Sequence, residues 1–200
     1  MKRSHVGIVL VLLLAVATIW AGASPPVVLG QDQVVVERLF RSVLTSVKPI
    51  FAPGQAGNPD AVIGFDTQGT VFEITEPIEN GLIPRPRQSG AEPMGRTFGE
   101  LRCIGNARVD RSKPMQIFVG KLKFVGRAMK FDATGTSIIH WCKNDKGQYS
   151  GVRWTDFSGA ISNVEGRHQG AKGHLVGTRL LIGEPDLKGQ SGLLILRLLE

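Results

Sequence analysis

The sequence predicts a mainly β protein, in which eight antiparallel strands close into a barrel after one N-terminal amphipathic helix. Three observations after residue 60 support this fold: apolar and polar residues alternate with a period of two, glycine-marked turns separate short apolar runs, and no helical pattern interrupts them. Closing such a sheet removes its edges, which would otherwise pair with other chains. A two-sheet β-sandwich is the alternative.

The first 23 residues have the layout of a secretory signal peptide. Lys2 and Arg3 precede an apolar run over 6–17, and small residues at 21–23 come just before Pro25. We therefore expect a secreted or periplasmic protein with no membrane span after cleavage. The alternative is an uncleaved N-terminal anchor that leaves the rest of the chain outside the cytoplasm, because the apolar stretch approaches the length of a membrane span.

Residues 32–48 are predicted to form one amphipathic helix. Its apolar residues recur at spacings of three and four: Val36, Leu39, Phe40, Val43 and Val47. Pro49 would end it, and residues 52–60 have the composition of a linker. The expected organisation is thus a signal peptide (1–23), a helix with its linker (24–60) and a barrel domain (61–200).

The eight strands are expected over 61–65, 70–75, 97–109, 116–131, 137–143, 149–160, 173–182 and 192–199. A hairpin turn at 66–69 would join the first two, and a second turn is expected at 144–147. A long loop is expected over 80–96. The last strand is apolar on both faces, so the helix over 32–48 is its natural outer cover.

Residues 165–173 read Glu-Gly-Arg-His-Gln-Gly-Ala-Lys-Gly, and this segment resembles a glycine-rich turn of allene oxide cyclase-like and dirigent-like barrels. The matching positions are Gly166, Gly170, Ala171 and Gly173, whereas Glu165 and His168 depart from the family pattern. The resemblance implies a small eight-stranded, calycin-like barrel with a mostly apolar interior. The glycines would supply positive φ angles and close backbone approach at the barrel end, and no active-site residue is carried over.

The two cysteines, Cys103 and Cys142, are predicted to form a disulfide, since an isolated pair in an oxidising compartment is more often bonded than free. Two buried thiols are the alternative. If Cys103 faces inward, such a bridge would also turn Cys142 and His140 inward.

Side chains of the predicted interior form the candidate site. His140 and Asp156 are candidates for acid–base catalysis inside the barrel, and a hydrogen-bonded core histidine is the alternative interpretation of His140. The residues expected to line a ligand cavity are Phe118, Leu122, Phe124, His140 and Trp154.

Composition argues against several classes of function. The 24 lysines and arginines outnumber the 17 acidic residues but are scattered, so no nucleic-acid-binding stripe is expected. His168 and His174 have no standard metal-ligand spacing, and neither a metal site nor a cofactor is predicted.

The leading hypothesis for function is therefore an exported barrel that binds a small apolar or amphipathic ligand. The alternatives are a structural or assembly protein of the cell envelope that forms homo-oligomers through residues 32–48, and an isomerase or cyclase that acts inside the barrel, which only the resemblance suggests.

Overall fold

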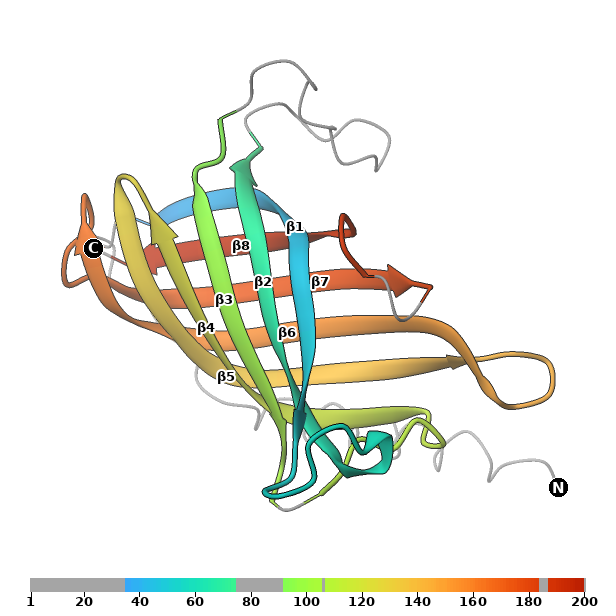
Figure 1. Cartoon of the computed structure of the whole chain (residues 1–200). Coiled ribbons are helices and arrows are strands. Elements are labelled where there is room, and N and C mark those ends of the chain that lie inside the picture. The colour runs from blue at the N-terminus through green and yellow to red at the C-terminus, as the bar shows by residue number, and fades with distance from the viewer. Residues whose placement is uncertain (1–34, 75–91, 106, 184–186, 200) are drawn as a thin grey trace, which may run out of the picture. The chain divides into compact units, whose positions relative to one another are not determined.

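The chain folds into a closed antiparallel barrel in which each strand pairs with its neighbours in sequence and β1 pairs with β8 (Figure 1). The computed structural model describes residues 35–74, 92–105, 107–183 and 187–199. The strands are β1 (Val35–Phe51), β2 (Val62–Glu73), β3 (Gly95–Cys103), β4 (Met115–Gly126), β5 (Met129–Lys143), β6 (Tyr149–Gly166), β7 (Lys172–Ile182) and β8 (Ser191–Leu199). Within these ranges the one helix is the short 3-10 turn η1 (Pro59–Ala61), and no helix there is long and apolar enough to cross a membrane.

The helix predicted over 32–48 is wrong, because residues 35–51 form strand β1. Residues 32–34 lie outside the described part of the chain. β-branched residues such as Val36, Val43 and Val47 favour extended backbone, and here β2 and β8 supply hydrogen-bond partners along both sides of β1. The barrel therefore begins at Val35 rather than at residue 61, and β1 forms part of its wall beside β8 rather than an outer cover.

The predicted number of eight strands is confirmed, but two errors in the predicted strands cancel each other in this count. The hairpin expected at 66–69 does not exist, since β2 runs through these residues and pairs with both β1 and β3. The missing strand is supplied by β1. The strand expected over 116–131 includes β4 and, after a turn, only the start of its antiparallel neighbour β5, which also contains the strand expected over 137–143. Residues 80–91 of the loop expected over 80–96 lie outside the described ranges, and β3 begins at Gly95.

Two predicted turns are confirmed. Between β5 and β6, the Asn144 side chain accepts hydrogen bonds from the backbone N–H groups of Lys146 and Gln148, both at 3.0 Å. Between β6 and β7, the glycine-rich segment has φ angles of +90° at Gly166 and +82° at Gly170. These values lie in the region that glycine adopts without steric penalty, so the structural role predicted for this segment is confirmed.

The barrel interior is layered along its axis. One apolar cluster fills one end and is made mainly of Phe40, Val71, Phe124, Phe131, Ile161, Leu175, Leu196 and Leu198. A second cluster, made of Phe65, Cys103, Phe118, Ile139 and Trp141, lies farther along the same strands. Between them lie shorter and polar side chains, including Ser42 and Ser137, which are 1% and 0% exposed. The interior is thus mostly apolar, as the family resemblance implied, with polar groups in mid-barrel.

The predicted disulfide is absent, and both cysteines are free. Cys103 is buried on β3 and lies in one cross-strand row with Phe118 of β4 and Ser137 of β5. Cys142 is five residues beyond Ser137 and follows Trp141, whose side chain points inward. An intervening strand and this offset in register keep the two thiols apart.

Because residues 35–51 form a strand, neighbouring substitutions in β1 should have different effects on stability. Leu44 is 2% exposed, whereas Val43 is on the alternate face and half-buried. We expect Leu44→Ala to lower the free energy of unfolding by about 2–5 kcal/mol and Val43→Ala by less than about 1 kcal/mol, because only the first empties a core position. Urea unfolding measures both; a larger loss for Val43→Ala would support a helix, in which Val43 belongs to the apolar face.

The thiols should differ in reactivity. Burial raises the pKa of Cys103 to about 11, so its reactive thiolate is scarce at pH 8. We expect a thiol reagent to label Cys142 first and Cys103 only after denaturation, and Cys142→Ala to remove the early phase. Denatured protein that shows no free thiol without a reductant would instead demonstrate a disulfide.

Candidate functional site

The middle layer of the barrel contains a cavity of about 90 Å³ that is lined by residues of all eight strands. Polar lining residues include Ser42, Thr97, Ser137 and Thr155, and Leu44 is among the apolar ones. The cavity is large enough for several water molecules and smaller than the roughly 150 Å³ that admits benzene. It can therefore hold a small molecule with a polar and an apolar part.

One cross-strand row of residues organises the polar side of the cavity. Ser42 of β1, Gly192 of β8, Arg179 of β7 and Thr155 of β6 are successive partners in the register. Arg179 Nη2 donates a hydrogen bond of 2.8 Å to Ser42 Oγ. A Cβ atom on Gly192 would lie 2.9 Å from Arg179 Nε, so the glycine leaves the space that the guanidinium occupies.

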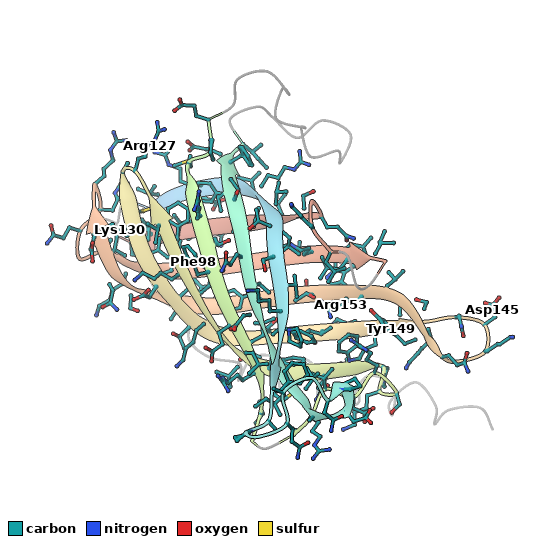
Figure 2. All side chains as sticks on the ribbon, viewed as in Figure 1. Phe98, Arg127, Lys130, Asp145, Tyr149 and Arg153 are labelled. Carbon is teal, nitrogen blue, oxygen red and sulfur yellow. The ribbon has the colours of Figure 1, made fainter. Side chains whose placement is uncertain are left out.

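A second arginine, Arg153, lies next to this row and is only 3% exposed. It precedes Thr155 by one inward position on β6, and its partner on β7 is Leu181. Its guanidinium carbon lies 4.8 Å from the centre of the Phe65 ring and 5.6 Å from that of Trp141. The guanidinium thus lies within cation–π distance of two aromatic rings. Figure 2 shows Arg153 between Asp145, at the tip of the β5–β6 hairpin, and the Arg127 end of the barrel.

Positively charged side chains border the cavity. Arg153, Arg179 and the exposed Lys121 border it, and no Asp or Glu is among its described lining residues. Burial, together with the nearby charge of Arg153, lowers the pKa of the Arg179 guanidinium to about 10. Arg179 remains protonated at neutral pH, and its Nε is buried without a hydrogen bond to any described residue.

Three of the residues predicted to line a ligand cavity do point into the barrel. Leu122 borders the cavity. Phe118 and Phe124 are buried in the two apolar clusters above and below it, where Phe124 packs against Phe131 with ring centres 5.0 Å apart. These two phenylalanines bound the middle layer without belonging to the cavity lining.

The predicted interior positions of His140, Asp156 and Trp154 are wrong. His140 and Asp156 are brought together, with His140 Nε2 3.9 Å from Asp156 Oδ2, but both side chains are 45% exposed. Asp156 Oδ1 accepts hydrogen bonds from Trp154 Nε1 at 2.6 Å and from Thr178 Oγ1 at 2.8 Å. The three residues lie on the outer surface because the inward positions of β5 and β6 are the alternate ones, such as Ile139 and Thr155.

Arg153, Thr155 and Arg179 were missed by sequence reasoning. On β6, Val152 and Trp154 make the other face look more apolar, and an arginine at an inward position contradicts the usual distribution of charge. One signal was available in the sequence: tracing alternate positions back from the apolar Ile161 places Arg153 and Thr155 inside.

Comparison with known proteins gives distant structural matches. No protein-family model matches the chain, and no curated protein matches it in sequence. Solved structures similar to it include a pyocyanin demethylase (13% identity, TM-score 0.45, 82% of this chain and 99% of that one) and a nonspecific heme-binding cyclase of neoabyssomicin biosynthesis (15%, 0.43, 100% and 78%). A third is the pterocarpan synthase dirigent protein GePTS1 (12%, 0.38, 84% and 83%).

The names of two of these structures describe a cyclase and a dirigent protein. With identities of at most 15% and TM-scores below 0.5, they assign neither a ligand nor a reaction to this chain.

The buried charge of Arg179 should reduce stability. Lowering the pKa of Arg179 to about 10 corresponds to about 3 kcal/mol against the charged form. We expect Arg179→Met to leave the free energy of unfolding unchanged or to raise it by up to about 2 kcal/mol, since lost hydrogen bonding to Ser42 offsets part of the gain.

The pH dependence follows from the same shift. Above about pH 10 the unfolded chain binds more protons at Arg179 than the folded chain, so the wild type should gain stability relative to Arg179→Met as the pH rises. Urea unfolding across this range measures the difference, with the exposed Arg197→Met as the matched control. A loss of more than 2 kcal/mol at pH 7 for Arg179→Met would contradict the expected cost of its charge.

Proposed function

We propose that this chain is a binding protein that holds a small amphipathic molecule in the mid-barrel cavity. The single observation that carries this proposal is the mixed lining of the cavity, in which a polar row lies against apolar side chains. A polar group of the ligand would meet Ser42 and Arg179, and its apolar part would meet side chains such as Leu44 and Leu122.

The barrel is suited to binding because its wall is already formed. Every strand is hydrogen-bonded to two neighbours, so the cavity has its shape before a ligand binds. A preformed site spares the entropy that a flexible site loses on binding. The volume of about 90 Å³ limits the ligand to a short chain or a molecule smaller than benzene.

The two other hypotheses lose the residues on which they depended. Assembly through residues 32–48 depended on an amphipathic helix, but residues 35–51 form strand β1, which is paired along both sides. Catalysis inside the barrel depended on His140 and Asp156, but both side chains lie on the outer surface. The cavity that the described residues form is therefore interpreted as a binding site.

We also propose that the protein acts outside the cytoplasm after its signal peptide is removed. The support for this location is the charge, apolar run and small residues of the first 23 positions.

Mass spectrometry of protein expressed with its natural N-terminus tests binding and export together. Under denaturing conditions we expect the mass of a chain cleaved near residue 23, and under native conditions an additional species that carries a small bound molecule. Solvent extraction should release this molecule from the folded protein.

The matched variants Thr155→Met and Thr134→Met separate cavity binding from surface adhesion. Thr155 lines the cavity and Thr134 is exposed on β5, so only the first substitution fills the binding space with a flexible apolar side chain. We expect Thr155→Met to lose the bound species and Thr134→Met to retain it, with unchanged far-ultraviolet circular dichroism in both. Retention of the molecule by a folded Thr155→Met would count against the cavity as its site.

A further inference from the structure

We propose that one side of the outer wall of the barrel is the surface on which a second copy of this chain docks. The register of five consecutive strands brings sixteen outward positions together there. This outer apolar face consists of every second residue over 115–119 of β4, 136–140 of β5, 152–158 of β6, 176–182 of β7 and 193–195 of β8. Figure 1 shows β5, β6, β7 and β8 side by side, so the face is continuous.

The first argument is that large apolar side chains gather on this face. Eleven of its sixteen residues are apolar. Of the nine large apolar side chains that are exposed among the described residues, seven belong to the face, and they are between 40% and 56% exposed. Among them are Met115, Trp154 and Leu180. Soluble monomers rarely expose a large contiguous apolar patch, and such a patch marks an interaction surface.

The second argument is the distribution of charge around the wall. The outer apolar face contains no lysine, arginine or glutamate. By contrast, the outward positions elsewhere on β3 and β4 include Arg96, Glu100, Lys121 and Lys123. The cores of protein–protein interfaces are depleted of charged residues in the same way, and tryptophan and methionine are enriched in them. The face thus has the composition of an interface core rather than of a hydrated surface.

The third argument is that the one carboxylate of the face keeps its partners when it is covered. Asp156 Oδ1 accepts hydrogen bonds from Trp154 Nε1 at 2.6 Å and from Thr178 Oγ1 at 2.8 Å. Asp156 Oδ2 lies 3.9 Å from His140 Nε2. All four residues belong to the face, and burying a carboxylate that is already hydrogen-bonded costs much less than burying an isolated one. A partner therefore needs no cation at this position, and a second copy of the same face supplies none.

The extent of the face agrees with pairing of two copies. Strands lie about 4.8 Å apart and outward residues about 6.8 Å apart along a strand, so sixteen residues cover about 500 Å² of wall. Projecting side chains raise the accessible area above this value, toward the roughly 800 Å² that each partner buries in a stable complex. Homodimer interfaces are the more apolar class, and two-fold pairing of one surface with itself is the commonest arrangement.

A lipid surface matches the face less well. Proteins that bind anionic membranes place lysine and arginine beside their apolar side chains. The outer apolar face has neither, and Asp156 puts a carboxylate within it. A second copy of this chain, which offers an uncharged apolar wall of the same size, is therefore the occupant that the charges and the area favour.

Sedimentation equilibrium of the purified protein, expressed with its natural N-terminus, tests the pairing. From low to high micromolar concentration we expect the mass to rise from that of one chain to that of two. Over the same range, iodide should quench the tryptophan fluorescence less, because association covers Trp154. The variant Trp154→Phe should lack this change, since Trp141 is buried in the barrel interior with or without a partner.

Matched lysine substitutions locate the contact. Leu180→Lys and Ile117→Lys put a charge on the face, and Phe98→Lys puts one on the outer wall at β3, where Phe98 is 41% exposed against 46% for Leu180. We expect the first two to weaken association at least tenfold, because an unpaired ammonium group is costly to bury, and Phe98→Lys to leave it unchanged. Far-ultraviolet circular dichroism checks the folding of each variant, and Ile117→Lys keeps the test decisive if Leu180→Lys does not fold.

The outcomes separate this proposal from its alternatives. The mass of a single chain at every concentration would overturn the pairing, and binding of that monomer to vesicles of phosphatidylglycerol and phosphatidylcholine would assign the face to a membrane. A mass of three or more chains would overturn the two-fold arrangement. Association that survives in folded Leu180→Lys and Ile117→Lys, or that Phe98→Lys weakens equally, would overturn its location on this face. The proposed ligand cavity is inside the barrel and is tested independently of these results.

Discussion

Closure of the barrel by β1 is the constraint on which the rest of the structure depends. This strand pairs with β2 over one edge and with β8 over the other, so it joins the two ends of the sheet. Without it, both neighbouring strands would expose unpaired backbone groups. Closure also brings Ser42 of β1 next to Arg179 of β7, with only Gly192 of β8 between them in the register. The polar row of the cavity thus exists only in the closed barrel.

The layered interior shows how the fold can contain two buried arginines. Apolar clusters on either side of the middle layer include Phe124 and Phe118, which are almost completely buried. Their burial contributes stability that does not depend on the cavity. The middle layer can then hold Arg153 close to two aromatic rings and Arg179 against Ser42, at a cost that the clusters offset. Proteins often carry such local destabilisation at sites of function.

The candidate site was harder to predict than the fold because it depends on which face of each strand points inward. A bridge from Cys103 to Cys142 would have required His140 to face inward, but Ile139 and Trp141 occupy the inner face instead. On β6, polar inward residues such as Arg153 conceal the alternation that normally marks a core. A shift of one residue exchanges the two faces of a strand completely, so these errors moved the expected site from the interior to the outer surface.

The sequence by itself determined that the chain is mainly β and where turns such as Asn144–Gly147 and the one at Gly166 and Gly170 occur; it favoured a barrel, but with a helix in place of the strand that closes it. These features depend on local alternation and on backbone angles that glycine favours. Only the tertiary structure decided that residues 35–51 form a strand, since their short apolar pattern suits helix or strand and the partners lie far away in sequence. It also decided the position of Arg179, because a buried cation requires neighbours such as Ser42 and Gly192 that come together only when the barrel closes.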